Sequence, residues 1–108
     1  MKTVTIFTPA YNRAHLLPRL YQSLLQQTCD DFCWLIIDDG SVDNTKTIVE
    51  NYISESKIQI NYIYQQNQGM HGAHNTAYRN INTVLNTCID SDDYMPENAV
   101  ELIINKWK

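Results

Sequence analysis

Basic residues are scarce in this sequence. Lysine and arginine together number 8 among 108 residues, against 12 aspartates and glutamates, and the formal net charge is -4 at pH 7. Binding to a nucleic-acid backbone needs clustered lysine and arginine, whereas the basic residues here are dispersed along the chain. The sequence therefore argues against a nucleic-acid-binding protein.

Long hydrophobic runs are missing too. No apolar stretch approaches the roughly 18 residues needed to span a bilayer. Residues 1–6 enter a strand pattern, where a secretory signal would need a longer apolar segment. We therefore expect a cytoplasmic protein.

Cysteine and glycine each occur 3 times. Cys88 lies in an apolar strand pattern, and Cys29 and Cys33 lack a second ligand pair at zinc-finger spacing, so we expect reduced thiols. No Gly-x-Gly-x-x-Gly or Gly-x-x-x-x-Gly-Lys-Ser/Thr motif is present, which argues against the usual dinucleotide and P-loop sites. Any bound phosphate must be held in another way.

Apolar runs of strand length alternate with helical patterns, which is typical of a parallel α/β sheet. The predicted strands are residues 4–7, 32–37, 58–64 and 83–89. The predicted helices run over residues 14–27, from a cap at Ser41 or Asp43 to about residue 56, over 73–81, and from Pro96 onward. We expect a Rossmann-like α/β fold, a mostly parallel sheet of about four strands with helices on both faces. The pattern favours a fragment, and the alternative is a small complete domain.

Two acidic clusters stand directly after predicted strands. Asp38 and Asp39 form the first acidic cluster, and Asp90, Asp92 and Asp93 form the second. In an extended segment, residues two apart point to the same side, so Asp90 and Asp92 can converge on one cation. Carboxylate oxygens suit Mg2+ or Mn2+, which also bind substrate phosphates. The alternative is an acidic turn that caps the next helix.

Four polar loops follow the predicted strands, at residues 8–13, 38–43, 65–74 and 90–94. Ligands of open parallel sheets bind beyond the carboxyl ends of the strands. The simplest interpretation is one site built from all four loops.

The motifs in these loops occur in a familiar order. They are Thr-Pro-Ala-Tyr-Asn-Arg at 8–13, Ile-Asp-Asp-Gly-Ser-Val-Asp-Asn-Thr at 37–45, Asn-Gln-Gly at 67–69 leading to Ala-His-Asn at 73–75, and Asp-Ser-Asp-Asp at 90–93. In order and spacing they resemble the family 2 glycosyltransferases of the GT-A fold over nearly the whole chain. The resemblance implies that residues 1–108 form the donor half of such an enzyme, which binds a nucleotide-diphospho-sugar, and that the acceptor half is absent.

The resemblance also implies which residues contact the donor. Positions that match the family's nucleotide contacts are Pro9, Ala10, Tyr11, Arg13, Asp38 and Asp39. Tyr11 offers a flat face for a base or ribose, Arg13 can bind phosphate or ribose oxygens, and a carboxylate of the first acidic cluster can accept the imide N–H of uracil. The alternatives are a packed aromatic ring, a solvated charge and a pair of turn-forming aspartates.

Asp90-Ser91-Asp92 matches the DxD motif of the family. The resemblance implies that Asp92 binds Mg2+ or Mn2+ and thereby the diphosphate, while Asp90 supports the metal or contacts the ribose. Ser91 belongs to the same nucleotide-sugar contact. Asp93 is left as an outer-sphere group or a helix cap.

The third loop departs from the family pattern, which often reads Gly-x-x-x-Ala-Arg-Asn-x-Gly. His74 stands in place of the arginine and Ala77 in place of the later glycine. Gly69, His74 and Asn75 are still expected at the site. His74 or His71 can hydrogen-bond phosphate or sugar, and more strongly when protonated below about pH 6.5. The alternatives are an exposed histidine without a role and a charge supplied by Arg79.

The resemblance implies transfer of a sugar, with inversion, from a UDP-sugar or related donor to an unknown acceptor in cell-surface polysaccharide or glycoconjugate synthesis. Inverting members take their general base from the acceptor half, so no catalytic residue is assigned and the chain alone is expected to transfer little sugar. Peripheral association with the inner face of the membrane is left open for a longer protein. The other functions considered are a sugar nucleotidyltransferase, a signalling receiver domain and a non-catalytic sugar-nucleotide-binding module.

Overall fold

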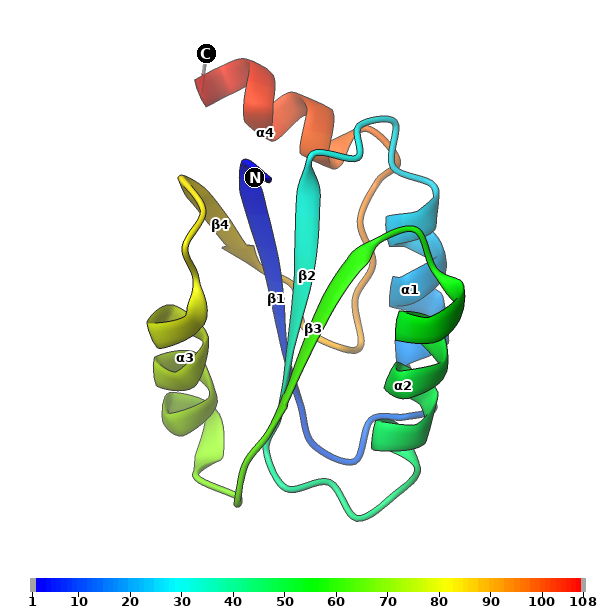
Figure 1. The fold of residues 1–108 in the computed structure, drawn as a ribbon, viewed down its shortest axis with the longest axis vertical. Coiled ribbons are helices and arrows are strands. Elements are labelled where there is room, and N and C mark those ends of the chain that lie inside the picture. Colours follow the sequence, from blue (N-terminus) through cyan, green and yellow to red (C-terminus); the bar gives the residue numbers. More distant parts are fainter. Residues whose placement is uncertain (1, 108) are drawn as a thin grey trace.

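The computed structural model describes residues 2–107, in which four strands alternate with four helices (Figure 1). The strands are β1 (Val4–Ala10), β2 (Phe32–Asp38), β3 (Gln59–Tyr64) and β4 (Leu85–Cys88), and the helices are α1 (Leu17–Leu25), α2 (Thr45–Glu55), α3 (Gly69–Asn80) and α4 (Ala99–Trp107). The four strands form one parallel sheet in the order β3-β2-β1-β4. The predicted α/β fold is confirmed, and the end residues Met1 and Lys108 lie outside the described part.

Helices cover both faces of the sheet, as predicted. A large hydrophobic cluster around the fully buried Trp34 joins α1, α2 and α4 to one face. A smaller cluster on the other face packs Ala73 and Ala77 of α3 against Leu35 and Ile37 of β2. Figure 1 shows α3 on one side of the sheet and α1 and α2 on the other. Because successive side chains of a strand face opposite ways, the continuous apolar run of β2 supplies both clusters.

β1 continues to Ala10, three residues further than predicted. Pro9 has no backbone N–H and was expected to end the strand. The carbonyl of Phe7 accepts a hydrogen bond from Ile89 next to β4, so Pro9, two residues on, faces the same side. Pairing with β4 stops at Phe7, and the missing N–H therefore costs no hydrogen bond. The early end of β4 opens the sheet beside Pro9.

Helix starts differ from the prediction at both ends of the sequence. α1 begins at Leu17 rather than Ala14, because Pro18 in its first turn cannot donate a hydrogen bond to Ala14. α4 begins at Ala99 rather than Pro96, after a turn closed by the Ala99 amide and the Pro96 carbonyl. These shifts lengthen the loops that precede α1 and α4.

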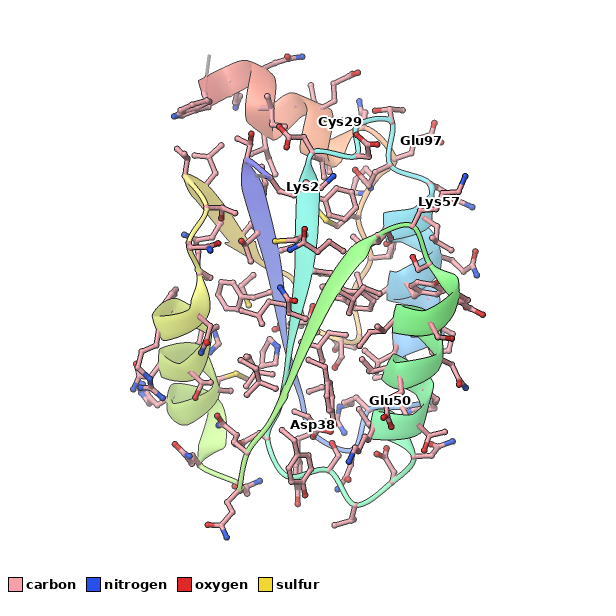
Figure 2. The ribbon with its side chains drawn as sticks, in the orientation of Figure 1. Lys2, Cys29, Asp38, Glu50, Lys57 and Glu97 are labelled. Atoms are coloured by element: carbon pink, nitrogen blue, oxygen red, sulfur yellow. The ribbon has the colours of Figure 1, made fainter. Side chains whose placement is uncertain are left out.

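The carboxyl ends of the four strands meet at one end of the sheet. Figure 2 shows Asp38 at this end, while Lys2 and Lys57 lie toward the opposite end. Cys29, Cys33 and Cys88 carry free thiols, as expected. In the described part of the chain, no helix has both the length and the apolar character of a membrane span.

Candidate functional site

A cavity of about 370 Å³ lies at the carboxyl ends of the strands. All four polar loops contribute to it. Its lining consists of Pro9, Ala10, Tyr11, Arg13, Asp39, Asn67, Gly69, Met70, Ala73, Asp90, Ser91 and Asp92. The chain thus brings together segments up to 83 residues apart in sequence, from Pro9 to Asp92.

Most of the predicted site residues line this cavity, but Asp38, His74 and Asn75 lie outside its lining. Asn67, Met70 and Ala73 line it and were not predicted as site residues. Asn67 and Ala73 belong to the motif strings of the third loop, which were the available signal. Met70 is 60% exposed at the start of α3, and an isolated methionine carries no chemical pattern by which a sequence could reveal it.

Asp38 is fully buried at the end of β2. Its carboxylate accepts a hydrogen bond from the Ser41 amide at 2.8 Å and another from the Tyr62 hydroxyl at 2.5 Å. Burial, together with the hydrogen bond to Asp38, raises the pKa of Tyr62 above its ordinary value. Asp38 therefore fixes the turn after β2 to the neighbouring strand and does not face the cavity.

Asp39, the other member of the first acidic cluster, lines the cavity. Its Oδ1 accepts hydrogen bonds from Gln65 Nε2 at 2.9 Å and the Gln68 amide at 2.8 Å, and its Oδ2 accepts one from the Gly69 amide at 2.9 Å. These bonds satisfy the free amides at the start of α3, which explains why α3 begins at Gly69 rather than at Ala73. A carboxylate has about four acceptor positions, so Oδ2 keeps one for a ligand.

Gly40 directly follows the first acidic cluster and lies against Asn67 of the third loop. Its φ is +89°, and a Cβ at this position would lie 2.9 Å from the backbone nitrogen of Asn67. Only glycine combines the left-handed backbone with this close approach. The close contact brings Asn67 to the cavity wall.

The second acidic cluster is exposed. Within residues 2–107, the side chains of Asp90 and Asp92 take no part in any hydrogen bond, whereas Asp93 Oδ1 accepts one from the Tyr94 amide at 2.8 Å. The same part of the chain holds no preassembled group of three or more metal-binding side chains. Two free carboxylates in one cavity still fit Mg2+ or Mn2+, because these ions typically take one or two protein carboxylates and complete their shell with water and substrate oxygens.

The segment after this cluster is anchored to α1. The guanidinium carbon of Arg19 lies 4.2 Å from the centre of the Tyr94 ring. The Met95 amide donates to Ser23 Oγ at 3.0 Å, and Gln27 Nε2 donates to the Pro96 carbonyl at 2.7 Å. Arg19 and Ser23 are spaced four apart on one side of α1, and Gln27 lies two residues beyond the end of the helix at Leu25. This contact holds the second acidic cluster at the sheet edge.

His74 packs between α3 and the sheet. Its Nδ1 lies 3.0 Å from the Met70 carbonyl, and its Nε2 lies 3.7 Å from Cys88 Sγ. The ring meets that of Phe7 edge-on, with centroids 5.5 Å apart. Burial, followed by the charge of Asp90, raises the pKa of the Cys88 thiol to about 11. His74 thus has structural contacts outside the cavity lining.

His74 stands where the family pattern has an arginine, and no basic residue of α3 lines the cavity in its place. Asn75 is exposed, and Arg79 donates from Nη2 to Thr76 Oγ1 of its own helix at 3.2 Å. Arg13 is the single positively charged residue of the lining. An anion in this cavity therefore meets one arginine and, from the second acidic cluster, two carboxylates.

Known proteins share both the sequence pattern and the fold. The profile of one family, Glycosyl transferase family 2, matches residues 5–108. The chain is 37% identical over 106 residues to the chondroitin synthase of Escherichia coli, covering 97% of this chain and 15% of that protein. It is 32% identical over 103 residues to the glycosyltransferase GlyA of Streptococcus pneumoniae, covering 95% of this chain and 15% of that protein. The chain thus spans about 15% of the length of these relatives.

A solved structure of another protein has a similar fold. S. aureus TarS, residues 1–349, in complex with UDP-GlcNAc superposes with a TM-score of 0.88 at 27% identity, covering 97% of this chain and 30% of that one. The likeness confirms the predicted GT-A-like α/β fold.

Proposed function

We propose that this chain, which belongs to glycosyltransferase family 2, forms the donor-binding half of a sugar transferase. The observation that carries this proposal is the single cavity at the carboxyl ends of the strands, lined by loops that match the family's motifs. In residues 2–107 the cavity joins an aromatic ring, one arginine and two carboxylates without hydrogen bonds. Such a set suits a ligand with a base at one end and a diphosphate at the other.

The base end of the ligand would lie between Tyr11 and Asp39. Tyr11 is 46% exposed and lines the cavity, so its ring is available for stacking. Asp39 Oδ2 keeps an acceptor position, which suits the imide N–H of uracil. Asp38 lacks this access because it is buried against Tyr62. The UDP-GlcNAc complex of TarS supports a uridine donor.

The diphosphate end would lie at the second acidic cluster. Asp92, with Asp90, would hold Mg2+ or Mn2+, which supplies the positive charge that stabilises the diphosphate leaving group. Without a cation, the two carboxylates would repel the diphosphate. Arg13 can donate to a phosphate or ribose oxygen from the opposite loop, and Ser91 lines the wall between the two aspartates.

Gly69 and the start of α3 form another part of the cavity wall and would also face the donor. Gly69 has φ +77° and nothing lies within 4 Å of an added Cβ, so its backbone is open to the cavity. We place no catalytic base in this chain. Inverting transfer, an acceptor in cell-surface polysaccharide or glycoconjugate synthesis, and a base outside residues 1–108 complete the proposal, and the similarity to a chondroitin synthase supports the polysaccharide part.

Calorimetric titration of the chain with UDP, GDP and ADP, each with and without Mn2+, tests the proposal. We expect UDP to bind best, and binding to weaken at least about tenfold without Mn2+ or in Asp92→Ala, because the metal link to the diphosphate is lost. The matched control is Asp93→Ala, since Asp93 lies outside the cavity lining. Binding that ignores both the metal and the Asp92 substitution would overturn the proposed site.

A further inference from the structure

Two loops at the cavity are tied by a reciprocal pair of hydrogen bonds. The Asn12 amide donates to Ser41 Oγ at 2.8 Å, and the Val42 amide donates to Asn12 Oδ1 at 2.8 Å. Asn12 stands between Tyr11 and Arg13, both of which line the cavity, whereas Asn12 and Ser41 do not. The two residues thus connect the loops without contacting the space that a ligand would fill.

Asn12 also holds an unusual backbone conformation. Its φ is +52°, the one positive value among non-glycine residues 2–107. Asparagine adopts this left-handed region more easily than most residues, although at a steric cost. Such a conformation persists when surrounding contacts hold it, and both hydrogen bonds of Asn12 do so. The turn at Asn12 sets the direction of the chain from Tyr11 to Arg13.

Further hydrogen bonds connect Ser41 to the central sheet. Ser41 is buried, and its amide donates to Asp38 Oδ1 at 2.8 Å. Asp38 in turn accepts the hydroxyl of Tyr62 from β3. A continuous chain of hydrogen bonds therefore runs from the sheet to Asn12.

Asp43 adds a second tie between the same two loops. Its Oδ2 accepts the Ala14 amide at 3.1 Å, and its Oδ1 accepts the hydroxyl of Thr45 at 2.5 Å and the Thr45 amide at 3.1 Å. Asn44 occupies the N-cap position of α2. Of the two predicted caps, Asp43 accepts the Thr45 amide at the start of the helix, whereas Ser41 bonds to Asn12. The loop that carries Tyr11 and Arg13 is thus held at Asn12 and at Ala14.

We propose that Asn12 and Ser41 are positioning residues that hold Tyr11 and Arg13 ready for the nucleotide before it binds. The inference rests on the proposed function. A loop that is already ordered loses less conformational entropy on binding, so the same contacts give higher affinity. Loss of either hydrogen bond lowers the affinity through the loop, not through a contact with the ligand.

Four variants of the 108-residue chain separate the backbone from the side-chain contribution. Asn12→Gly keeps the left-handed backbone but removes the acceptor for Val42, and Ser41→Ala removes the acceptor for the Asn12 amide. Asn12→Asp retains an acceptor oxygen and should rescue binding. Asn51→Ala, on the exposed side of α2, is the matched control. UDP affinity in Mn2+ is measured by calorimetry, with thermal unfolding as the check on folding.

We expect Asn12→Gly and Ser41→Ala each to lower UDP affinity about fivefold, mainly through a less favourable binding entropy. Asn12→Asp and Asn51→Ala should stay within about twofold of the unmodified chain. Hydrogen exchange of the Asn12 and Val42 amides in the free chain gives a readout without nucleotide. Protection in the unmodified chain, lost at Val42 in Asn12→Gly and at Asn12 in Ser41→Ala, is the expected result.

The outcomes distinguish the two proposals. If the unmodified chain binds UDP and the Asn12→Gly and Ser41→Ala variants bind it equally well, positioning is overturned and the proposed function stands. If Asn12→Asp loses affinity as Asn12→Gly does, the role assigned to the acceptor oxygen is overturned. If the unmodified chain binds no UDP, the proposed function falls, and the inference falls with it.

Discussion

The two acidic clusters of this chain have opposite surroundings, although both follow strands of the same sheet. Asp38 and Asp39 are 0% and 5% exposed, and both carboxylates accept hydrogen bonds from loops and a neighbouring strand. Asp90 and Asp92 are exposed, and their side chains accept none within residues 2–107. The same residue type is therefore buried and hydrogen-bonded in one cluster and exposed in the other, at one end of the sheet.

The difference follows from the cost of removing a charge from water. A buried carboxylate is tolerated when hydrogen bonds replace its hydration, and its removal then leaves unsatisfied donors behind. An exposed carboxylate pays no such cost and contributes little to folding. Substitutions in the first acidic cluster should thus change the free energy of unfolding, whereas substitutions in the second should change ligand binding.

The largest expected effect is that of Asp38→Ala. The substitution leaves the Tyr62 hydroxyl and the Ser41 amide without an acceptor, and we expect a loss of about 3 kcal/mol in the free energy of unfolding. Urea unfolding measures the loss. Asp93→Ala is the control from the other cluster and should stay within about 0.5 kcal/mol of the unmodified chain. Equal losses in both variants would remove the contrast between the clusters.

Gly40→Ala tests the close contact beside the first acidic cluster. We expect a loss of about 2 kcal/mol, because the new Cβ is strained by a left-handed backbone and also meets the Asn67 backbone at 2.9 Å. Gly69→Ala is a matched control, since Gly69 has a similar φ of +77° and open space around the Cβ position. It should lose about half as much, from backbone strain alone. Urea unfolding of both variants gives the comparison, and a larger loss at Gly69 would contradict it.

Hydrophobic periodicity predicted the fold well because each element buries a face that its sequence displays. The sheet, the order of its elements and the helices on both faces follow from that pattern. Two element boundaries were wrong because a partner distant in sequence decides them. β1 passes through Pro9 because β4 stops pairing beside it, and α3 begins at Gly69 because Asp39 binds its free amides. Neither partner is visible in the local sequence.

The site was predicted at the level of loops rather than of side chains. The rule that ligands bind at the carboxyl ends of parallel strands selected four loops, and they do line one cavity. Sequence could not tell Asp38 from Asp39, because successive residues of an extended segment point to opposite sides and only the fold shows that Asp39 lines the cavity. His74 lies outside the cavity lining and packs against Phe7 and Cys88, and its role at the site stays a prediction. The ligand roles of the lining residues stay predictions.

Asp90 and Asp92 of the second acidic cluster are expected to bind the metal that holds the diphosphate. We expect Asp92→Asn to lower UDP affinity in Mn2+ about tenfold and Asp90→Asn about threefold, with unfolding free energies unchanged, because both side chains are exposed. Chelation of Mn2+ with EDTA should lower the affinity of the unmodified chain to that of Asp92→Asn. It should change the variant little, since its metal link is already weak. Calorimetry measures the unmodified chain and Asp92→Asn with Mn2+ and with EDTA, and Asp90→Asn with Mn2+. An additive effect of EDTA on Asp92→Asn would place the metal elsewhere.

The smallest expected effect concerns the anchor of the second acidic cluster on α1. Arg19→Met keeps an apolar stem over the Tyr94 ring but removes the cation that lies 4.2 Å from its centre. We expect a loss of about 0.5 kcal/mol in the free energy of unfolding and a drop of about twofold in UDP affinity in Mn2+, because Asp90 and Asp92 are held less firmly. Arg19→Lys, which keeps a positive charge, should lose less of both. If Arg19→Met destabilises the chain without any change in UDP affinity, the anchor supports folding alone, and the exposed cluster does not depend on α1 for its position.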